Sequence, residues 1–302
     1  MKLASALPSF TPRRALGRTG FHATVLGIGD LADRSQPLES CVRTVRRALD
    51  AGVNLIDTAP AYENGYGEEI VGAALQGRRE GIFVIDKIDD LRDPVAPQVE
   101  ASLGRLRMER VDLIAFHDVS RMDDWEAIAA PGGGMEQLAA LVQAGKVSFR
   151  GISSHRPDVL AAAIRSGLCD VVMLPVGPFV DLRYVEEILP LAKALGVGTV
   201  AFKTFGAGKL LEDTSGYNEP LPGAVPGKPR LPRLSVEECV RYTLTVDPDV
   251  ALLGLSRNEE QDAAFAAAHA FAPLSPAEME EVRSSAERAV AGKGACWWNP
   301  PA

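Results

Sequence analysis

Short apolar runs alternate with amphipathic segments along most of the chain, and this alternation predicts strands and helices in turn. Residues 12–26 come first, with the turn residues and extended pattern of a small hairpin. A segment with apolar residues at helical spacing follows each apolar run. The predicted strands are 25–29, 53–56, 82–85, 111–116, 148–152, 171–174, 198–202 and 250–254. The predicted helices are 37–51, 68–75, 94–106, 135–144, 157–166, 184–195, 236–245 and 259–270.

Eight strand–helix units in a chain of 302 residues favour a closed barrel over an open doubly wound sheet. An open dinucleotide-binding sheet would show G-x-G-x-x-G after its first strand, and the nearest stretch, Gly27-Ile-Gly29-Asp-Leu-Ala, lacks the third glycine. We therefore expect an α/β fold, a single (β/α)8 TIM barrel domain over residues 1–302, with an N-terminal β-hairpin. Residues 1–12 are expected to form a loose arm and 271–302 a C-terminal extension.

Two predicted connections, 118–134 and 206–234, are too long to be simple links. Both follow strands, so we expect long loops on the C-terminal face of the barrel, where such loops shape a substrate pocket. The extension carries Trp297 and Trp298. They could fold over the mouth of the pocket or seal the outside of the barrel, and the sequence leaves both alternatives open.

The composition restricts the partners that we expect. A net charge of −8 argues against a general nucleic-acid or anionic-membrane surface. No apolar run has the roughly 18 residues of a membrane helix, and the N-terminal stretch is a poor signal peptide. The four cysteines are far apart and form no C-x-x-C, so we expect no metal site and a reducing, cytoplasmic location.

Four polar side chains at neighbouring strand ends predict a site that handles a proton. Asp57, Lys87 and His117 end the second, third and fourth predicted strands, and Tyr62 lies in the loop after Asp57. The carboxyl ends of barrel strands meet at one mouth. A lysine ammonium lowers the pKa of a nearby tyrosine, and an aspartate keeps that lysine charged. Such a tyrosine can exchange a proton with an alkoxide or alcohol, while a histidine holds the oxygen.

Each of these four residues also has an ordinary structural explanation when it is taken alone. Asp57 could cap a loop, Lys87 could neutralise a neighbouring carboxylate, and His117 could be a satisfied polar residue at the rim. Tyr62 could be a packing residue of the loop. The four types together at the four expected places favour the proton-handling hypothesis.

Several segments of the chain are characteristic in combination. They are Leu16-Gly-Arg-Thr-Gly20, Asn54-Leu-Ile-Asp-Thr-Ala-Pro-Ala-Tyr62, Gly65-Tyr-Gly-Glu68, Asp86-Lys87, Asp112-Leu-Ile-Ala-Phe-His117, Gly145-Lys-Val-Ser-Phe-Arg-Gly-Ile-Ser153 and Phe205-Gly-Ala-Gly-Lys-Leu210. On these segments the chain, from about Arg14 to Ala270, resembles the aldo-keto reductase family. The resemblance implies a (β/α)8 barrel, a nicotinamide cofactor and hydride transfer to an aldehyde or ketone. It also implies that Tyr62 is the general acid/base, that Lys87 and Asp57 tune it, and that His117 orients the substrate carbonyl.

The resemblance also implies where the cofactor binds. Ser153-Ser154 stands where the family commonly has Ser-Asn, Met173 where a glutamine is usual, and Glu260 where an arginine is often found. Phe202 would stack on the nicotinamide. The candidate cofactor-binding residues are Gly29, Asp30, Ser153, Ser154, Met173, Phe202, Lys203, Gly206, Gly208, Leu210, Ser256, Arg257 and Glu260. With Lys203 and the backbone of 206–210 at the pyrophosphate, and Ser256 and Arg257 at a 2′-phosphate, we expect NADP(H) in preference to NAD(H).

The function that we expect is an NAD(P)-dependent oxidoreductase acting on a small carbonyl compound or the matching alcohol, with sugars as one candidate class. A non-catalytic nicotinamide-cofactor-binding sensor or regulatory subunit on the same barrel is the alternative. A Schiff-base enzyme using Lys87 or Lys203 is a third hypothesis, and it leaves Tyr62 and His117 without roles. The sequence does not indicate the substrate, the direction of reaction or the oligomeric state.

Overall fold

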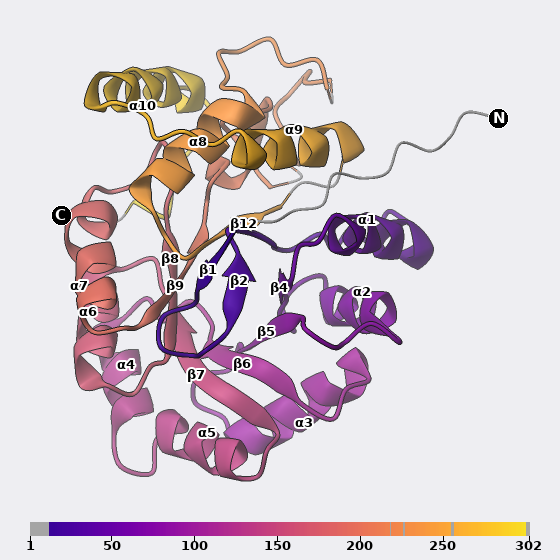
Figure 1. Ribbon diagram of the computed structural model, residues 1–302, viewed down its shortest axis with the longest axis vertical. Coiled ribbons are helices and arrows are strands. Elements are labelled where there is room, and N and C mark those ends of the chain that lie inside the picture. Colours follow the sequence, from indigo (N-terminus) through magenta and orange to yellow (C-terminus); the bar gives the residue numbers. More distant parts are fainter. Residues whose placement is uncertain (1–11, 218, 226, 255–256, 300–302) are drawn as a thin grey trace.

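A closed barrel of parallel strands forms the centre of the computed structural model (Figure 1). The structure describes residues 12–217, 219–225, 227–254 and 257–299. The strands follow one another around the barrel in the order β12-β3-β4-β5-β6-β7-β8-β9. Their bounds are β3 (Leu26–Ile28), β4 (Leu55–Asp57), β5 (Phe83–Ile88), β6 (Val111–Phe116), β7 (Val147–Ser153), β8 (Val171–Pro175), β9 (Gly198–Phe202) and β12 (Val250–Leu253). The predicted (β/α)8 barrel is confirmed.

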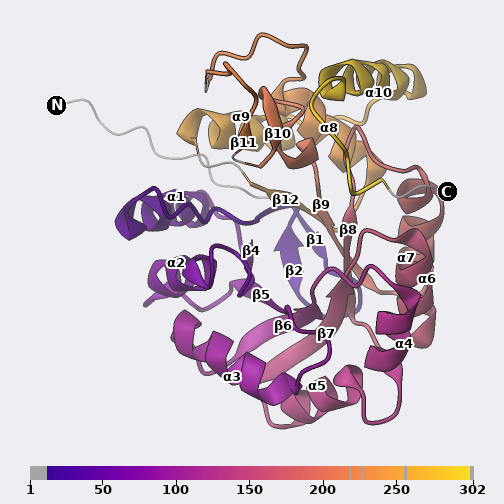
Figure 2. The same cartoon turned by 180° about the vertical axis from the view of Figure 1, so that it is seen from behind.

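Helices surround the barrel in both views (Figures 1 and 2). They are α1 (Leu38–Asp50), α2 (Tyr66–Leu75), α3 (Val95–Leu106), α5 (Gly134–Gln143), α6 (Pro157–Ser166), α7 (Leu189–Ala194), α8 (Val236–Val246) and α9 (Asn258–His269). Each buries an apolar stripe against the strands, as α1 does with Cys41, Val42, Val45 and Ala48. The segment predicted as one helix over 184–195 begins with a π-helical turn, η1 (Tyr184–Ile188), and continues as α7.

The N-terminal hairpin closes one end of the barrel. It consists of β1 (Arg13–Ala15) and β2 (His22–Thr24), as predicted. Leu16, which is fully buried, packs into the cluster of apolar side chains that includes Leu55 and Phe83. The Asn54 side chain accepts a hydrogen bond from the Thr24 backbone N–H at 2.7 Å and ties the hairpin to β4. The opposite end, where the carboxyl ends of the strands meet, is therefore the end available to ligands.

Helices α2 and α3 approach closely because α2 carries a glycine at the contact. A Cβ atom added to Gly72 would lie 2.4 Å from the Leu106 carbonyl oxygen, which is far inside van der Waals contact. Gly104 on α3 is different, because a Cβ atom there would meet nothing within 4 Å. Glycine is thus required for packing at one of these helical positions and not at the other.

The segments predicted only as long loops and as an extension contain further elements. The connection 118–134 holds α4 (Met122–Ala129), and 206–234 holds the short turn η2 (Gly206–Gly208) and the hairpin of β10 (Thr214–Gly216) and β11 (Glu219–Pro220). The extension contains α10 (Pro276–Val290), which begins with a capping box of Ser275 and Glu278. Of the predicted loose arm, residues 1–11 lie outside the described residues.

The chain after α10 folds over the carboxyl end of the barrel. Trp298 is fully buried, and its Nε1 donates a hydrogen bond to the Phe179 carbonyl at 2.8 Å. The Tyr184 hydroxyl donates to the Trp298 carbonyl at 3.1 Å. Trp297 is half-exposed and packs on Tyr217, with ring centroids 5.6 Å apart. Of the two alternatives for the tryptophans, the structure therefore has the one in which they cover the mouth.

Two fully buried lysines tie this C-terminal tail to the loop after β9. Lys209 Nζ donates to the carbonyl oxygens of Lys293 and Ala295, each at 2.7 Å. Lys293 Nζ donates in return to the Lys209 carbonyl at 2.8 Å and to those of Glu212 and Pro232 at 2.9 and 3.3 Å. Carbonyl oxygens thus replace water around both ammonium groups, and we call this pair the lysine clasp.

Candidate active site

The four predicted catalytic residues meet at the mouth of the barrel. Strands β4, β5 and β6 are neighbours, with Asp57 paired to Ile85 and Lys87 to Ala115 in the parallel register. Lys87 lies inside β5 rather than at its end, because the strand continues to Ile88. Its Nζ donates to Asp57 Oδ1 at 2.6 Å and to the Thr58 carbonyl at 2.7 Å.

Asp57 and Lys87 form a buried ion pair, with side chains only 3% and 2% exposed. Burial raises the pKa of Asp57, while the Lys87 charge and the Tyr62 hydroxyl act in the opposite direction. Removing one partner of such a pair leaves an uncompensated buried charge, which typically costs about 3–5 kcal/mol. Neither residue of the pair can therefore be replaced alone without a large loss of stability.

Tyr62 lies beside this ion pair, on a tight loop. Glu63 and Asn64 both have positive φ, at 50° and 53°, and Gly65 follows at 84°. The Lys87 ammonium is 4.6 Å from the centre of the Tyr62 ring. The His117 ring stands edge-on to the same ring, with centroids 5.6 Å apart.

The prediction that Lys87 lowers the pKa of Tyr62 is wrong for this structure. The pKa of Tyr62 is raised well above its ordinary value, first by burial and then by the charges of Asp57 and Asp30. The Lys87 ammonium is directed to Asp57 and the Thr58 carbonyl, so its charge is largely compensated. Tyr62 consequently keeps its proton at neutral pH and is a proton donor in this state.

His117 is held by a carboxylate that the sequence analysis did not single out. Its Nδ1 hydrogen-bonds Asp89 Oδ1. The other oxygen of Asp89 accepts the Ala61 backbone N–H at 2.6 Å. Asp89 lies two residues after Lys87, and this spacing places both side chains on one face of an extended segment. The spacing is the feature of the sequence that could have identified Asp89 as a residue of the site.

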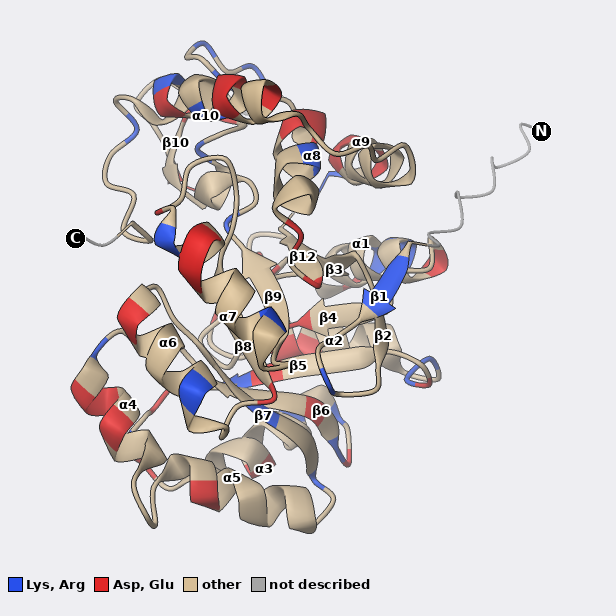
Figure 3. Ribbon diagram, turned by 60° about the vertical axis from the view of Figure 1, so that its left-hand side comes forward, with Lys and Arg blue, Asp and Glu red and all other residues tan. Residues whose placement is uncertain are grey.

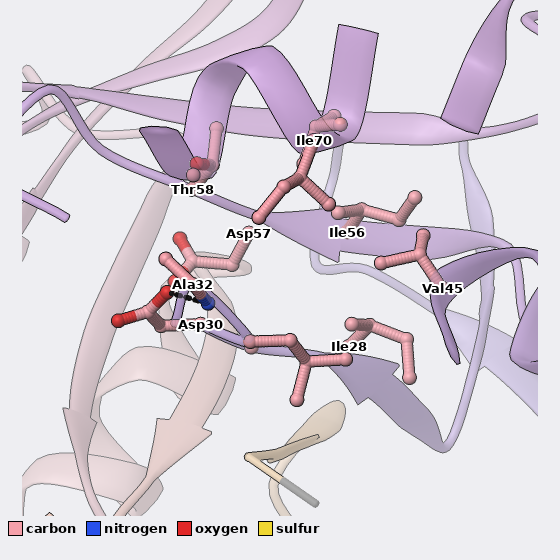
Figure 4. Close-up of a pocket in the computed structure, with 12 residues that line it drawn as sticks. Ile28, Asp30, Ala32, Val45, Ile56, Asp57, Thr58 and Ile70 are labelled. Carbon is pink, nitrogen blue, oxygen red and sulfur yellow. Dashed lines mark hydrogen bonds between the residues drawn. The ribbon is translucent and has the colours of Figure 1, made fainter. Parts of the chain in front are cut away.

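Gly29 and Asp30, two of the predicted cofactor residues, lie at the end of β3 beside Asp57 (Figure 4). The Asp30 carboxylate accepts the Ala32 backbone N–H at 2.8 Å. Desolvation raises the pKa of Asp30 to about 6, although the Ala32 hydrogen bond and the Lys87 charge oppose this. A cavity of about 10 Å³ separates these residues from α1 and α2, which is room for about one water.

The serines after β7 are committed to the protein itself. Ser153 Oγ accepts the Asp118 backbone N–H at 2.9 Å, and Ser154 Oγ donates to the Val119 carbonyl at 2.7 Å. Met173 on β8 belongs to the apolar cluster inside the barrel. All three residues are buried, and their contact with a cofactor stays a prediction.

Phe202 and Lys203 end β9 on the other side of the mouth. Lys203 Nζ donates to the Tyr217 hydroxyl at 2.7 Å and lies within 5.8 Å of the centres of four aromatic rings, those of Phe202, Tyr217, Trp297 and Trp298. Burial lowers the pKa of Lys203 to about 8. Within the described part of the chain no carboxylate forms an ion pair with it, although the charge of Asp118 partly opposes the effect of burial on its pKa.

The glycine-rich turn after Lys203 offers less than expected. The backbone N–H groups of Gly206, Gly208 and Leu210 donate to the carbonyl oxygens of Lys203 and Phe205. Leu210 is fully buried, and the side chain of Lys209 points to the C-terminal tail. These N–H groups are therefore already satisfied, and the predicted pyrophosphate contact depends mainly on Lys203.

Arg257, one of the two residues expected at a 2′-phosphate, lines a cleft of about 350 Å³ beside the start of α8 and α9, together with Glu260. Arg257 pairs there with Glu212 at 2.6 Å and also with Glu260. Arg233 lines the same cleft. Two arginines and two glutamates leave the cleft without net charge. Ser256, the other residue of this prediction, lies outside the described residues.

Away from the mouth, acidic residues mark the outer helices α4, α8, α9 and α10 (Figure 3). None of the described helices is both long and apolar enough to cross a membrane. In the described ranges no three His, Cys, Asp or Glu side chains gather in a way that could hold a metal ion.

Comparisons with known proteins agree with this geometry. The model of a family described as "Aldo/keto reductase family" matches residues 24–223. The uncharacterized oxidoreductase YqkF of Bacillus subtilis is 28% identical over 213 residues, which cover 66% of this chain and 67% of YqkF. L-galactose dehydrogenase of Arabidopsis thaliana is 29% identical over 218 residues, covering 66% and 67%. The structure of aldo-keto reductase AKR11C1 from Bacillus halodurans superposes with a TM-score of 0.70 at 25% identity, over 90% of this chain and 95% of that one.

Proposed function

The chain belongs to the aldo/keto reductase family of oxidoreductases, and we propose that it transfers a hydride between a nicotinamide cofactor and a small carbonyl compound or the corresponding alcohol. The observation that carries the proposal is the convergence of Asp57, Tyr62, Lys87 and His117 at one mouth. Lys87 contacts Asp57 and the face of Tyr62, and His117 stands at the edge of Tyr62. The four residues come from three separate segments of the sequence, which lie together because β4, β5 and β6 are neighbours in the barrel.

Each of the four residues has a role that follows from its contacts. Tyr62, whose raised pKa keeps the phenol protonated, gives its proton to the oxygen of a carbonyl as negative charge develops there. His117, with a partly accessible ring, binds and orients that oxygen. Lys87 and Asp57 fix the position of Tyr62 and supply the electrostatic field around it. The nicotinamide, when bound, supplies or accepts the hydride.

The mouth contains groups that fit such a cofactor. Lys203 is half-buried, forms no ion pair with a carboxylate among the described residues, and has a pKa of about 8 because burial disfavours its charge. A pyrophosphate placed against it would compensate that charge and bury little additional polar surface. Phe202, half-buried at the end of β9, offers a flat face for the nicotinamide ring.

The expected preference for NADP(H) is less well supported by the geometry. A 2′-phosphate beside Arg257 would meet the carboxylates of Glu212 and Glu260, which already satisfy this guanidinium. Like charges at contact distance disfavour such a phosphate, whereas a ribose hydroxyl could donate to either carboxylate. We therefore propose that the site binds NAD(H) at least as tightly as NADP(H).

For the substrate we propose a small polyhydroxy carbonyl compound or alcohol, such as a sugar. One relative, named L-galactose dehydrogenase, acts on a sugar by its name. The aromatic rings of Tyr217 and Trp297, at 63% and 44% exposure, lie at the mouth and offer faces for the C–H surfaces of a sugar ring.

Substitution of Tyr62 by Phe tests the proposal. The variant should lose turnover on a panel of aldehydes, ketones and sugars, while the quenching of tryptophan fluorescence by NADH or NADPH is retained. Retained turnover would refute the role of Tyr62. If the unmodified protein bound cofactor and turned over none of the panel, the non-catalytic alternative would replace the proposal.

A further inference from the structure

One carboxylate connects the two side chains that would meet the substrate oxygen. Asp89 directly follows Ile88, the last residue of β5. Its Oδ1 hydrogen-bonds His117 Nδ1 at the end of β6, and its Oδ2 accepts the Ala61 N–H at 2.6 Å in the loop after β4. Ala61 immediately precedes Tyr62. Asp89 therefore bridges three neighbouring strand ends and sets the positions of Tyr62 and His117 relative to each other.

The bond from Asp89 also determines where His117 carries its proton. A carboxylate accepts hydrogen bonds and cannot donate them, so Nδ1 of His117 has to be the donor. A neutral imidazole has only one N–H, which leaves Nε2 as an acceptor. Nε2 becomes a donor only when the ring is the doubly protonated imidazolium. In the described parts of the chain nothing hydrogen-bonds Nε2, and the side chain is 23% exposed, so this nitrogen faces outward to a ligand.

We propose that Asp89 is a positioning residue that makes carbonyl binding depend on the protonated form of His117. A carbonyl oxygen only accepts hydrogen bonds, so it is held by the imidazolium and not by the neutral ring. This inference rests on the proposed function. In the reduction, the carbonyl carbon gains a hydride from the reduced nicotinamide, the oxygen gains the proton of Tyr62, and water reprotonates Tyr62. Asp89 and His117 exchange no proton with the substrate in this step.

Several charged groups face the His117 ring and respond to its charge. They are Asp57 at the end of β4, with its partner Lys87 on β5, Asp89 after β5, and Asp118 directly after the ring's own position. Burial raises the pKa of Asp57, and the His117 charge is among the effects that oppose this rise. The hydrogen bond from His155 is the main cause that lowers the pKa of Asp118 to about 2, and the His117 charge adds to it. Tyr62, whose ring packs against that of His117, is a further titratable neighbour.

Substitution of Asp89 by Asn gives a direct spectroscopic test. The Ala61 N–H needs an acceptor, so the amide oxygen takes the place of Oδ2 and the NH2 group faces His117 Nδ1. Nδ1 then becomes an acceptor, and the neutral ring carries its proton on Nε2. The protein has four histidines, so their long-range 1H–15N imidazole spectra can be assigned by single substitutions. We expect the Nδ1–H form of neutral His117 in the unmodified protein and the Nε2–H form in the Asp89→Asn variant.

The pH profile of carbonyl reduction gives the functional test. For the unmodified enzyme, kcat/KM should fall about tenfold per pH unit along the alkaline limb of its profile, because only the imidazolium donates to the carbonyl oxygen. In the Asp89→Asn variant the neutral ring can donate from Nε2, so kcat/KM should fall less than about threefold over the first two pH units of that limb. A purely structural role of Asp89 would lower the whole profile without changing its shape.

Two further variants keep the outcomes distinct. Asp90→Asn changes the adjacent acid, which accepts only the Arg92 and Asp93 backbone N–H groups through Oδ1, and should leave the histidine spectrum and the profile unchanged. Tyr62→Phe should abolish turnover and leave the His117 tautomer as it is. An unmodified protein with neutral His117 in the Nε2–H form, or an Asp89→Asn profile parallel to that of the unmodified enzyme, would overturn the inference. Turnover by Tyr62→Phe with the expected tautomers would overturn only the proposed function.

Discussion

Replacement of Lys293 by Met should destabilise the protein through the lysine clasp. The side chain is fully buried, and methionine is of similar length, so the change removes hydrogen bonds rather than volume. The carbonyl oxygens of Lys209, Glu212 and Pro232 lose their donor, and the Asp213 carboxylate loses an ion pair at 4.0 Å. Each unsatisfied buried acceptor costs about 1–3 kcal/mol, and the relief of burying an ammonium offsets part of the sum. We expect a net loss of about 3 kcal/mol.

This loss can be converted into a change of melting temperature. The entropy of unfolding of globular proteins is about 2.1 cal/mol/K per residue, so the 302 residues here give an entropy of unfolding of roughly 0.6 kcal/mol/K. A loss of about 3 kcal/mol then lowers Tm by about 5 °C. Differential scanning calorimetry of the two proteins at one scan rate measures this difference.

Lys228, in the loop after β9 that Lys293 contacts, provides a control of the same residue type. Its side chain is exposed, and Lys228→Met should change Tm by less than about 1 °C, because substitutions at exposed sites typically stay within about 0.5 kcal/mol. If the Lys293 and Lys228 variants melted within about 1 °C of each other, the clasp would contribute nothing measurable. The view that carbonyl oxygens compensate these buried ammonium groups would then be refuted.

Three other predictions concern the cofactor cleft, the mouth and the helix packing. Glu260→Gln removes one of the two carboxylates that pair with Arg257, so NADPH binding should tighten about tenfold relative to NADH binding in a fluorescence titration. An unchanged ratio of the two dissociation constants would contradict the proposed placement of the 2′-phosphate. Burial raises the pKa of Asp30 in the folded protein to about 6, so its ionisation costs stability as pH rises from about 4 to 6. The urea midpoint of unfolding of Asp30→Asn should therefore equal that of the unmodified protein at pH 4 and be higher at pH 7.5. Equal midpoints at both pH values would contradict the raised pKa. Gly72→Ala should lower the free energy of unfolding by more than about 2 kcal/mol because of the backbone contact, whereas Gly104→Ala should raise it by about 0.5–1 kcal/mol; the same sign for both would contradict the packing.

The barrel and its mouth could be predicted because both follow from periodic patterns. Apolar runs give the strands, and parallel strands place their carboxyl ends together, so Asp57, Lys87 and His117 had to meet. Helix α10 could also have been predicted from its capping box, since Ser275 and Glu278 are spaced as such a box requires. Helix α4 has no capping side chain of this kind at its start, and it was read as loop.

The electrostatics could not be predicted, because they depend on pairings between distant positions. Asp89 stands among several acids near Lys87, and only the register of β5 and β6 shows that it faces His117. The pairing of Arg257 with Glu212 joins positions 45 residues apart and helps to neutralise the positive charge that was expected in the cleft. The raised pKa of Tyr62 likewise results from burial, which the sequence does not report.

The lysine clasp has a consequence for the biosynthesis of the enzyme. Lys293 and Trp298 follow every strand of the barrel in the chain, so a ribosome delivers them after the strands have emerged. Until then the Lys209 ammonium lacks the carbonyl oxygens of the tail, and the Phe179 carbonyl lacks its donor. A nascent chain can therefore close its barrel before the C-terminal tail completes the mouth. The barrel can fold during translation, whereas the complete ligand-binding end forms only after the tail has been synthesised.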